Sequence, residues 1–549
     1  MHGSRVLALV ALAILPNGAG AQRSLTGGSQ PGIDVLHYEF RVDFPARALP
    51  DTLQFVSTTV ARRTARVQSV DLDLTTAMQV EAVTVNGTAA PFRHDSAKVR
   101  VSLAAGNGDT LRIVVRYRGA PKDGLIIRRD STGGYWTAFG DNFPDRARQW
   151  LATVDHPSDK ATVEWIVRAP QSHRVVANGE LLEETPELLA GGAPGMLLTR
   201  WRTNRPLYTA VMVIGVAPFA VYELGKTACN LAELPGCVRQ SVWITPDVRP
   251  YMPGPFARVG EMVSLFSRLV APFPYEKLAH VQSSTRYGGM ENASAIFYAD
   301  NIYRRRSMSE GLLAHEIAHQ WFGDAVTTRE WPHVWLSEGF ATYFSAVWFE
   351  HSAGDSAFRA NLAQMRRQVL SSRVTNEKPI VDLGLDDLDR VLNSNVYQKA
   401  GFTLHMLRRE IGDSAFYRGI RSYYRKYRHG NALTEDFQRE VEASSGRKLD
   451  WFFTQWMHRP GVADLTVQWR WDARRRGMEL TVSQNPAFAP YQLSLAMDVT
   501  DARGRVHRAS ASIPAARVAT LLVPLRIQGA PASVVFDPDS SILGKIAVP

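Results

Sequence analysis

The pentapeptide His315-Glu316-Ile317-Ala318-His319 has the residue types of a metal-dependent hydrolase, at a spacing that a helix can use. Residues four positions apart lie one turn apart on the same face of an α-helix. The imidazoles of His315 and His319 can therefore converge on one tetrahedral zinc ion. Glu316 adjoins the first histidine and faces elsewhere, so we expect it to take a proton from a metal-activated water rather than bind the ion.

A catalytic zinc ion requires a third protein ligand and keeps its fourth position open. Glu338 is the candidate for this ligand. The eighteen residues between His319 and Glu338 suffice to end one helix, cross a loop at Trp331-Pro332 and begin a second helix. We expect Ser337 to cap that second helix. Thr342 falls one turn after Glu338, and we expect its hydroxyl to hold a metal-binding imidazole in the required tautomer.

Two further motifs accompany this pattern, Gly288-Gly289-Met290-Glu291-Asn292 and Tyr397-Gln398-Lys399-Ala400-Gly401. Together the three motifs resemble the zinc aminopeptidases of the aminopeptidase N type, peptidase family M1, and they stand in the family's order. The resemblance extends from Asp34 to Trp456, over most of the chain. It implies a thermolysin-like catalytic domain with one Zn²⁺, acting on peptides that have a free N-terminus.

The resemblance also implies the roles of the hydrolytic residues. His315, His319 and Glu338 would hold the zinc ion. Glu316 would activate water and then pass the proton to the leaving amine. Tyr397 would donate its hydroxyl to the tetrahedral oxyanion.

The recognition of the substrate amine is likewise implied by resemblance. Glu291 would bind the free α-ammonium through charge-assisted hydrogen bonds. Its neighbours would lie on an extended edge that can pair with the substrate backbone; they are Gly288, Gly289, Met290 and Asn292. In the family a Gln that follows a Thr helps to hold the amine, but here Thr137 is followed by Ala138. We expect Asp141 and Asn142 to substitute for that Gln.

Hydrophobic periodicity divides the chain into three regions that must position these motifs. Residues 33 to about 225 read as β-strands, with a tight turn at Asn86-Gly87 and a strand-like run over Leu207–Val216. From about 255 to 459 the spacing is helical; the apolar positions are Phe358, Leu362, Met365, Val369, Leu404, Leu407 and Ile411, with Gly412 at a C-terminal cap and Thr434 at an N-cap. From 463 onward the period returns to two.

We therefore predict a multidomain α+β protein. Residues 22–226 would form an N-terminal β-sheet or sandwich domain, 227–460 the α-rich zinc catalytic domain, and 461–549 a small C-terminal β-sandwich. Many relatives add a large helical domain, which we do not expect in this chain. Its cleft would then be more open, or a partner subunit would cover it; the sequence leaves the oligomeric state open.

The N-terminus resembles an export signal. A basic start is followed by a ten-residue apolar run over Val6–Leu15, and the Ala19-Gly20-Ala21 pattern predicts cleavage after Ala21. The run is too short to span a bilayer, so we expect an exported protein without an integral membrane segment, the alternative being an N-terminal anchor. Cys229 and Cys237 flank a Pro-Gly turn, and in an oxidising compartment they predict a local disulfide, the alternative being two free thiols.

Composition and charge limit the other classes of function. The chain of 549 residues is 45% hydrophobic and 21% charged, which is ordinary for a globular protein. Its net charge is +10, but no basic stripe with stacking aromatics is present, so we expect no nucleic-acid partner. Three alternatives to an aminopeptidase remain: a zinc endopeptidase of thermolysin type, an epoxide hydrolase as a minor variant, and a non-catalytic peptide-binding module with a vestigial metal site.

Overall fold

The computed structural model describes residues 30–45, 52–129, 134–187, 195–227, 238–248, 251 and 254–549. The predicted signal peptide and both cysteines, Cys229 and Cys237, lie outside the described residues, so cleavage after Ala21 and the disulfide stay predictions. The chain divides into two compact units. The first runs to Trp331 and includes 386–388 and 424–432; the second comprises 332–385, 389–423 and 433–549. The boundaries of the three predicted domains stay a prediction.

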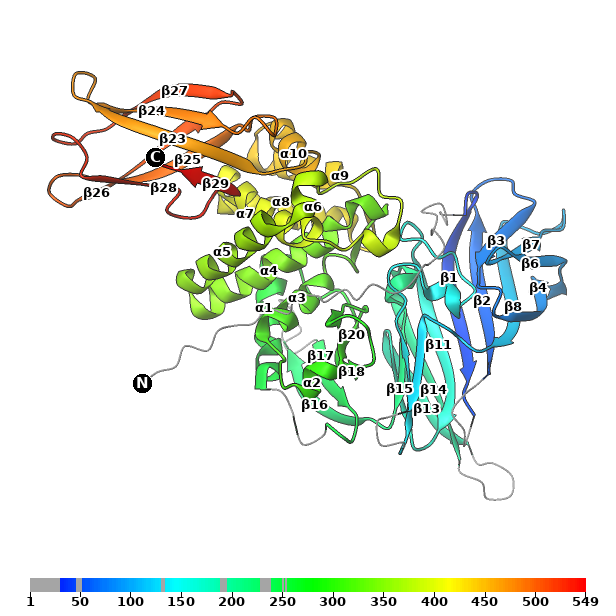
Figure 1. Ribbon diagram of the computed structural model, residues 1–549. Helices are drawn as coiled ribbons and strands as arrows, with labels where there is room; N and C mark the ends of the chain where they lie inside the picture. Colours follow the sequence, from blue (N-terminus) through cyan, green and yellow to red (C-terminus); the bar gives the residue numbers. More distant parts are fainter. Residues whose placement is uncertain are drawn as a thin grey trace. The chain divides into compact units, whose positions relative to one another are not determined.

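The first unit begins with three β-sheets (Figure 1). The eight-stranded sheet has the order β13 (Glu180–Glu187), β14 (Met196–Leu207), β11 (Ala161–Pro170), β1 (Ile33–Asp43), β2 (Leu53–Arg63), β8 (Thr110–Gly119), β4 (Gln79–Val85) and β5 (Thr88–Ala89). The four-stranded sheet has the order β12 (Arg174–Ala177), β15 (Ile214–Ala217), β10 (Trp136–Gly140) and β9 (Leu125–Arg129). The three-stranded sheet has the order β3 (Ser69–Asp73), β7 (Lys98–Ser102) and β6 (Phe92–Asp95).

Local sequence signals account for much of this region. The side chains of Tyr38, Phe40 and Val42 alternate along β1 and are buried. Asn86 and Gly87 both have positive φ, as a tight hairpin turn between β4 and β5 requires. The run over Leu207–Val216 was wrongly predicted as one strand, because β14 ends at Leu207 and β15 begins only at Ile214.

The interruption in that run is a buried 3-10 turn, Thr209–Val211. The backbone carbonyls of this turn and of Met212 accept hydrogen bonds from side-chain amides rather than from a neighbouring strand. The Asn142 amide donates to the carbonyls of Thr209 and Met212, and Asn178 donates to Val211. Because every residue of the segment is buried, its hydrophobicity alone does not distinguish a turn from a strand.

A fourth sheet in the first unit supports the candidate site. It has five strands in the order β16 (Ala220–Thr227), β17 (Val238–Ile244), β18 (Lys277–Ser283), β20 (Ala295–Ala299) and β19 (Gly289–Met290). Three helices belong to this part of the unit: α1 (Val259–Leu269), α2 (Asp300–Arg304) and α3 (Glu310–His319). A short parallel pair joins β21 (Val326–Thr328) to β22 (Gly430–Ala432).

The prediction of a continuously helical region from about 255 was therefore wrong between α1 and α2. β18 and β20 pair in parallel and are almost entirely buried. Because both faces are buried, neither strand alternates between apolar and polar residues: β20 is apolar throughout, and β18 combines apolar residues with the buried polar side chains of His280 and Gln282.

The second unit contains a group of helices. They are α4 (Trp335–Ala353), α5 (Asp355–Ser371), α6 (Arg373–Glu377), α7 (Ala400–Ile411), α8 (Asp413–Tyr427, whose last turn belongs to the first unit), α9 (Thr434–Ser445) and α10 (Asp450–Met457). The predicted face of α5 is confirmed, since Phe358, Leu362, Met365 and Val369 are all buried. Gly412 ends α7 with a positive φ, as predicted. α4 has buried residues on all sides, as expected for a central helix.

Two predicted helix caps were wrong. Val334, not Ser337, is the N-cap of α4. Leu433, not Thr434, is the N-cap of α9, and the Asp436 carboxylate accepts a hydrogen bond from the Leu433 amide. The Thr434 hydroxyl is instead hydrogen-bonded to the rings of His333 and Trp335, so it is not available as a cap.

The second unit ends in two small sheets that enclose a common core. Their orders are β27 (Val518–Pro524), β24 (Gly477–Gln484), β23 (Ala463–Asp472), β29 (Gly544–Ala547), and β26 (Val506–Ile513), β25 (Leu493–Thr500), β28 (Ser533–Phe536). Leu465 on β23 and Leu495 on β25 are fully buried, as their alternation predicted. The ring centres of Trp456 on α10 and Tyr491 lie 4.7 Å apart with the rings tilted by 34°, a contact between α10 and this β part.

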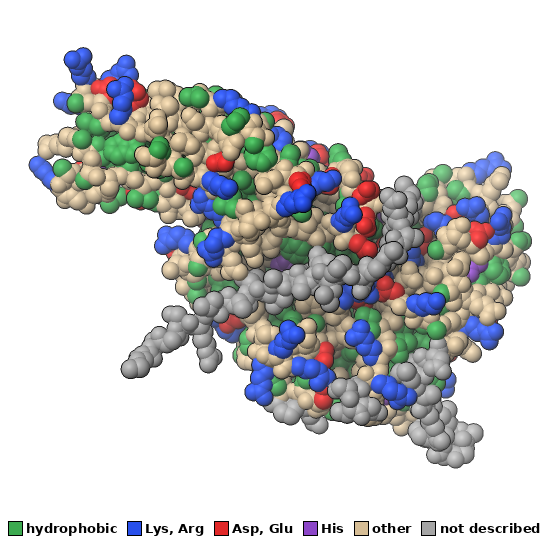
Figure 2. Space-filling view, viewed as in Figure 1, with side chains coloured by type: hydrophobic (Ala, Val, Ile, Leu, Met, Phe, Trp, Pro, Cys, Tyr) green, Lys and Arg blue, Asp and Glu red, His purple; other side chains and the backbone are tan. Residues whose placement is uncertain are grey.

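The predicted class, a multidomain α+β protein, is confirmed by these sheets and helices. Among the described residues, no helix is both long enough and apolar enough to cross a membrane. On the face seen in Figure 2, Lys and Arg side chains are spread out and interspersed with Asp and Glu.

Candidate active site

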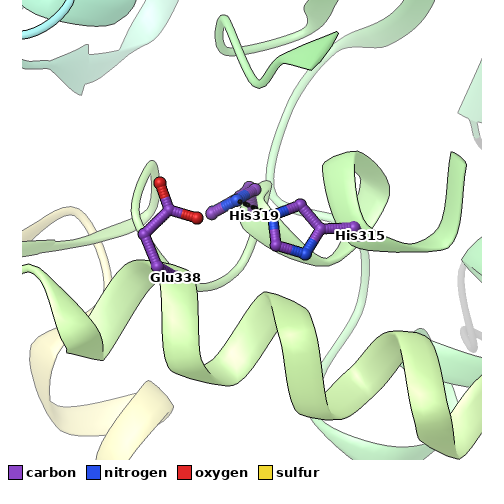
Figure 3. Close-up of side chains that lie close together, drawn as sticks. All are labelled: His315, His319 and Glu338. Atoms are coloured by element: carbon purple, nitrogen blue, oxygen red, sulfur yellow. Dashed lines mark hydrogen bonds between the residues drawn. The ribbon is translucent and has the colours of Figure 1, made fainter. Parts of the chain in front are cut away.

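The structure brings together the three predicted metal ligands. One ligand atom each of His315, His319 and Glu338 lies within 4.8 Å of the other two. The Nε2 atoms of the two histidines are 3.1 Å apart, and Figure 3 shows the Glu338 carboxylate directed toward the rings. Two ligands at about 2.0–2.1 Å from a tetrahedral zinc ion are separated by a similar distance. Two nitrogens and one carboxylate oxygen are a donor set that suits zinc with one open position.

The tautomer of the second imidazole is set by the protein backbone. The Nδ1 atom of His319 lies 3.1 Å from the carbonyl oxygen of Phe322, which can accept a hydrogen bond from a protonated Nδ1. The Nε2 lone pair is then available to a metal ion. Within the part of the chain that the structure describes, the Thr342 hydroxyl makes no hydrogen bond, so the predicted role of Thr342 stays a prediction.

α3 positions both histidines and the predicted base. Ser309 caps this helix by accepting a hydrogen bond from the Leu312 amide. The Glu316 side chain is only 4% exposed and packs against β19. A Cβ atom at Gly289 would lie 2.2 Å from Glu316 Oε1, so only glycine allows this approach.

Tyr397 lies in a π-helical turn, Asn395–Lys399, that leads directly into α7. Its hydroxyl donates to Glu338 Oε1 at 2.9 Å, which places it beside a predicted metal ligand. The buried Asn395 fixes the turn by donating to the carbonyl of Lys378 and accepting from the Thr375 hydroxyl. Single π-helical turns often occur at functional sites.

Glu291 directly follows the edge strand β19, and its predicted amine-binding role stays a prediction. Its side chain is buried, and carboxylate atoms of Glu291 and Glu316 and a nitrogen of His319 lie within 4.8 Å of one another. Two carboxylates this close favour a bound cation. Burial, followed by the Glu291 charge, raises the pKa of the nearby Asp324 carboxyl well above its ordinary value.

Gln320 is a site residue that the sequence reasoning missed. Its side-chain amide donates to the Glu291 carbonyl and to the Asp324 carboxyl, each at 2.9 Å. Its side-chain oxygen accepts from the Ser294 amide. Gln320 thereby holds the backbone at Glu291 and at Ser294, three residues further on. Its position directly after the second histidine did not indicate these contacts, because Glu291 and Ser294 lie in a different element.

The remaining predicted substrate residues have varied surroundings. Gly288 and Gly289 are partly exposed, whereas Met290 and Asn292 are buried. Asn292 is fully buried, and neither polar atom of its side chain has a partner among the described residues. The predicted role of these residues stays a prediction.

Ala138 lies in β10 (Trp136–Gly140), and Asp141 and Asn142 directly follow that strand. Ala138 is buried in β10. Both N–H groups of Asn142 donate to backbone carbonyls, and its oxygen accepts from the Trp150 indole at 2.8 Å. Asp141 is also buried, and its carboxylate is ion-paired with arginine. The predicted contact of these side chains with the substrate stays a prediction.

The comparisons with known proteins all point to the same peptidase family. Residues 259–456 match the Peptidase family M1 domain. The chain is similar to a leucyl aminopeptidase of Saccharolobus solfataricus, with 24% identity over 71% of this chain and 49% of that protein. It is similar to an aminopeptidase N of Streptomyces lividans, with 24% identity over 66% of this chain and 44% of that protein. The chain thus spans about half the length of these relatives or less.

A solved structure shares the fold over a larger fraction of its own length. It is that of an M1 zinc metallopeptidase from Deinococcus radiodurans, with a TM-score of 0.66 and 25% identity. The match covers 79% of this chain and 95% of that one.

Proposed function

We propose that this chain, a member of peptidase family M1 of the aminopeptidase N type, is a zinc-dependent aminopeptidase that releases the N-terminal residue of peptides. Its cofactor is one zinc ion, and the residues that would hold it are His315, His319 and Glu338. When bound, the zinc ion supplies Lewis-acid polarisation of the scissile carbonyl. The rest of the reaction depends on side chains of the protein.

The proximity of Glu291 to Glu316 and His319 is the observation that carries this proposal. Atoms of all three side chains lie within 4.8 Å of one another. In a peptide, the α-amino nitrogen and the carbonyl carbon of the same residue are two bonds, or about 2.5 Å, apart. A carboxylate that binds the ammonium must therefore lie only a few ångströms from the hydrolytic groups. This arrangement favours cleavage after the first residue.

Each side chain then has a defined task. Glu291 accepts hydrogen bonds from the substrate ammonium and sets the register of the peptide. Glu316 takes the proton of the attacking water and delivers it to the leaving amine. Tyr397 donates its hydroxyl to the oxyanion that develops on the carbonyl oxygen. The edge strand β19 offers backbone groups to an extended peptide.

A panel of aminoacyl p-nitroanilides tests the proposal, assayed with and without a chelator. We expect hydrolysis that the chelator abolishes and that added zinc restores. The matched control is a peptide of the same sequence with a free or an acetylated N-terminus. The free peptide should lose one residue at a time, and the acetylated peptide should be resistant.

Other outcomes identify the rival functions. Internal cleavage of the acetylated peptide would contradict the proposal and would indicate an endopeptidase. A protein that binds zinc but hydrolyses none of the amides would be a binding module.

Export is a further part of the proposal, and it rests on the sequence of residues 1–21 alone. N-terminal sequencing of the protein recovered from its native host should give Gln22 as the first residue. A mature chain that begins at Met1 would contradict export by cleavage.

A further inference from the structure

Asp141 lies at the centre of a buried ion-pair network in the first unit. Its side chain is 0% exposed. One carboxylate oxygen accepts from Arg146 Nη2 and Arg286 Nε, both at 2.9 Å. The other oxygen accepts from the Thr285 hydroxyl at 3.0 Å. Three donors thus already satisfy the carboxylate, two of them cationic.

This network holds the chain immediately before the motif that contains Glu291. Thr285 and Arg286 both bind Asp141, and Arg286 also binds Asp123 through Nη2. The next residue, Tyr287, lies under the Arg146 guanidinium, whose carbon is 5.7 Å from the ring centre. Three successive residues therefore contact a segment that lies about 140 positions earlier in the chain.

The other end of the motif is held in a similar way. The Asn178 amide donates to the carbonyl of Ala293 at 2.7 Å, and the Gly179 amide donates to the Ser294 hydroxyl at 2.8 Å. Between these two attachment points lie residues 288–292, with the edge strand β19 and Glu291. The segment is therefore fixed at both ends by residues from the earlier part of the chain.

We infer that Asp141 is a positioning residue for amine recognition, which acts through Arg286 and Thr285 on the segment that carries Glu291. The inference rests on the proposed aminopeptidase function. It assigns Asp141 a different role from a direct contact with the substrate amine, because its oxygens are already bound to buried donors. A displacement of the segment would move Glu291 relative to Glu316, and small displacements of a binding group are costly in catalysis.

Arg286 is the better residue to change, because its side chain is 46% exposed and its loss leaves Asp141 paired with Arg146. The measured quantity is a discrimination ratio: kcat/KM for the best aminoacyl p-nitroanilide divided by kcat/KM for the same compound without its amine. We expect Arg286→Gln to lower this ratio about tenfold, because residues of one hydrogen-bond and salt-bridge network are energetically coupled. The discrimination ratio of Arg286→Lys should lie between those of the wild type and Arg286→Gln, since a single ammonium cannot bridge Asp123 and Asp141 as the guanidinium does.

A double-mutant cycle separates the two roles of Asp141. If Asp141 acts through Arg286, Asp141→Asn combined with Arg286→Gln should lower the ratio no further than the larger single change. If Asp141 touches the ammonium, Arg286→Gln should leave the ratio intact, and Asp141→Asn should lower it equally in both backgrounds. That second outcome would overturn the inference.

Controls distinguish positioning from a general loss of stability. Asp71→Asn removes an acidic partner of Arg100 in the three-stranded sheet and should leave the ratio unchanged. Zinc content and melting temperature are measured for every variant. If Arg286→Gln lowers the melting temperature but not the ratio, the network is only structural and the inference fails. Failure of the proposed function would differ, because the wild-type protein would then show no discrimination in favour of the amine.

Discussion

Glu316 is the residue whose replacement should have the clearest effect on catalysis. It is buried beside Gly289 and is the only carboxylate between the two histidines of α3. Glu316→Gln keeps the shape of the side chain but cannot accept a proton. We expect kcat to fall about 10²–10⁴-fold, the usual contribution of general acid–base catalysis. Zinc content, measured by metal analysis, should be unchanged.

The matched control for this variant is Glu310→Gln at the start of the same helix. Glu310 pairs with Arg258 and is partly exposed. Its replacement should leave kcat within about twofold, as for most exposed ion pairs. Equal losses in the two variants would contradict a specific role for Glu316.

Tyr397 should affect the transition state more than substrate binding. Tyr397→Phe removes the hydroxyl that lies 2.9 Å from Glu338 Oε1. If this group stabilises the oxyanion, kcat should fall about 10²–10³-fold while KM changes little. Tyr222→Phe, on the edge strand β16, is the control and should be neutral.

The contact with Glu338 offers a different explanation, which the same variant can test. If the hydroxyl serves only to hold the metal ligand, Tyr397→Phe should weaken zinc binding, and excess zinc should restore the activity. Restoration would argue against a role in oxyanion stabilisation.

At the scale of single residues, sequence spacing predicts what one helix can align. His315 and His319 come together because a helical turn separates them. Glu338 was predicted because a catalytic zinc ion needs a third ligand, and the structure places it beside the two histidines. Gln320 was missed because its partners, Glu291 and Ser294, lie in a different element, and nothing in the spacing relates them.

At the scale of elements, the close approach of β19 to α3 requires that residue 289 be a glycine, which has no Cβ atom. A Cβ atom at Gly289 would lie 2.2 Å from Glu316 Oε1 and 2.7 Å from its Cγ. Gly289→Ala must therefore displace the base or the edge strand. We expect kcat/KM to fall at least tenfold, with a cooperative unfolding transition retained. Gly108→Ala, where nothing lies within 4 Å of the new Cβ, is the control.

Elements were predictable where one face was buried and the other was not. α5 shows this pattern, with four buried positions at helical spacing. β18 and β20 do not, because their two faces are buried alike and the sequence loses its period. The predicted cap at Thr434 was wrong for a related reason: its hydroxyl is hydrogen-bonded to the rings of His333 and Trp335, which lie about 100 positions earlier in the chain, and not to its own helix.

At the scale of the whole molecule, contacts between distant segments shape the site. Asp141 and Arg286 are 145 positions apart, and Asn178 and Ala293 are 115 apart. The sequence around each of these residues gives no sign of its distant partner. Hydrophobic periodicity indicates only which residues within a few turns share a face. The α+β architecture was therefore predictable from patterns, whereas the attachment of the Glu291 segment to the earlier sheets was not.

Buried lysines give the whole molecule a predictable dependence of stability on pH. Lys399 is fully buried, and its amine has a long hydrogen bond of 3.4 Å to the Arg459 carbonyl. Burial, reinforced by the charge of Arg459, lowers its pKa to about 7 in the folded protein. In the unfolded chain the pKa is about 10.4.

The sign of the effect follows from proton counting. Below pH 7 Lys399 is protonated in both states, and the cost of burying its charge is present in full. Between about pH 7 and 10 only the unfolded chain retains the proton, so the free energy of unfolding should rise with pH.

Lys399→Met removes this pH-dependent contribution to the free energy of unfolding. Its free energy of unfolding should exceed that of the wild type most at pH 6–7, and the difference should shrink toward pH 10. Urea denaturation across that range measures it, with the exposed Lys545→Met as the control; parallel pH profiles for wild type and Lys399→Met would contradict the lowered pKa.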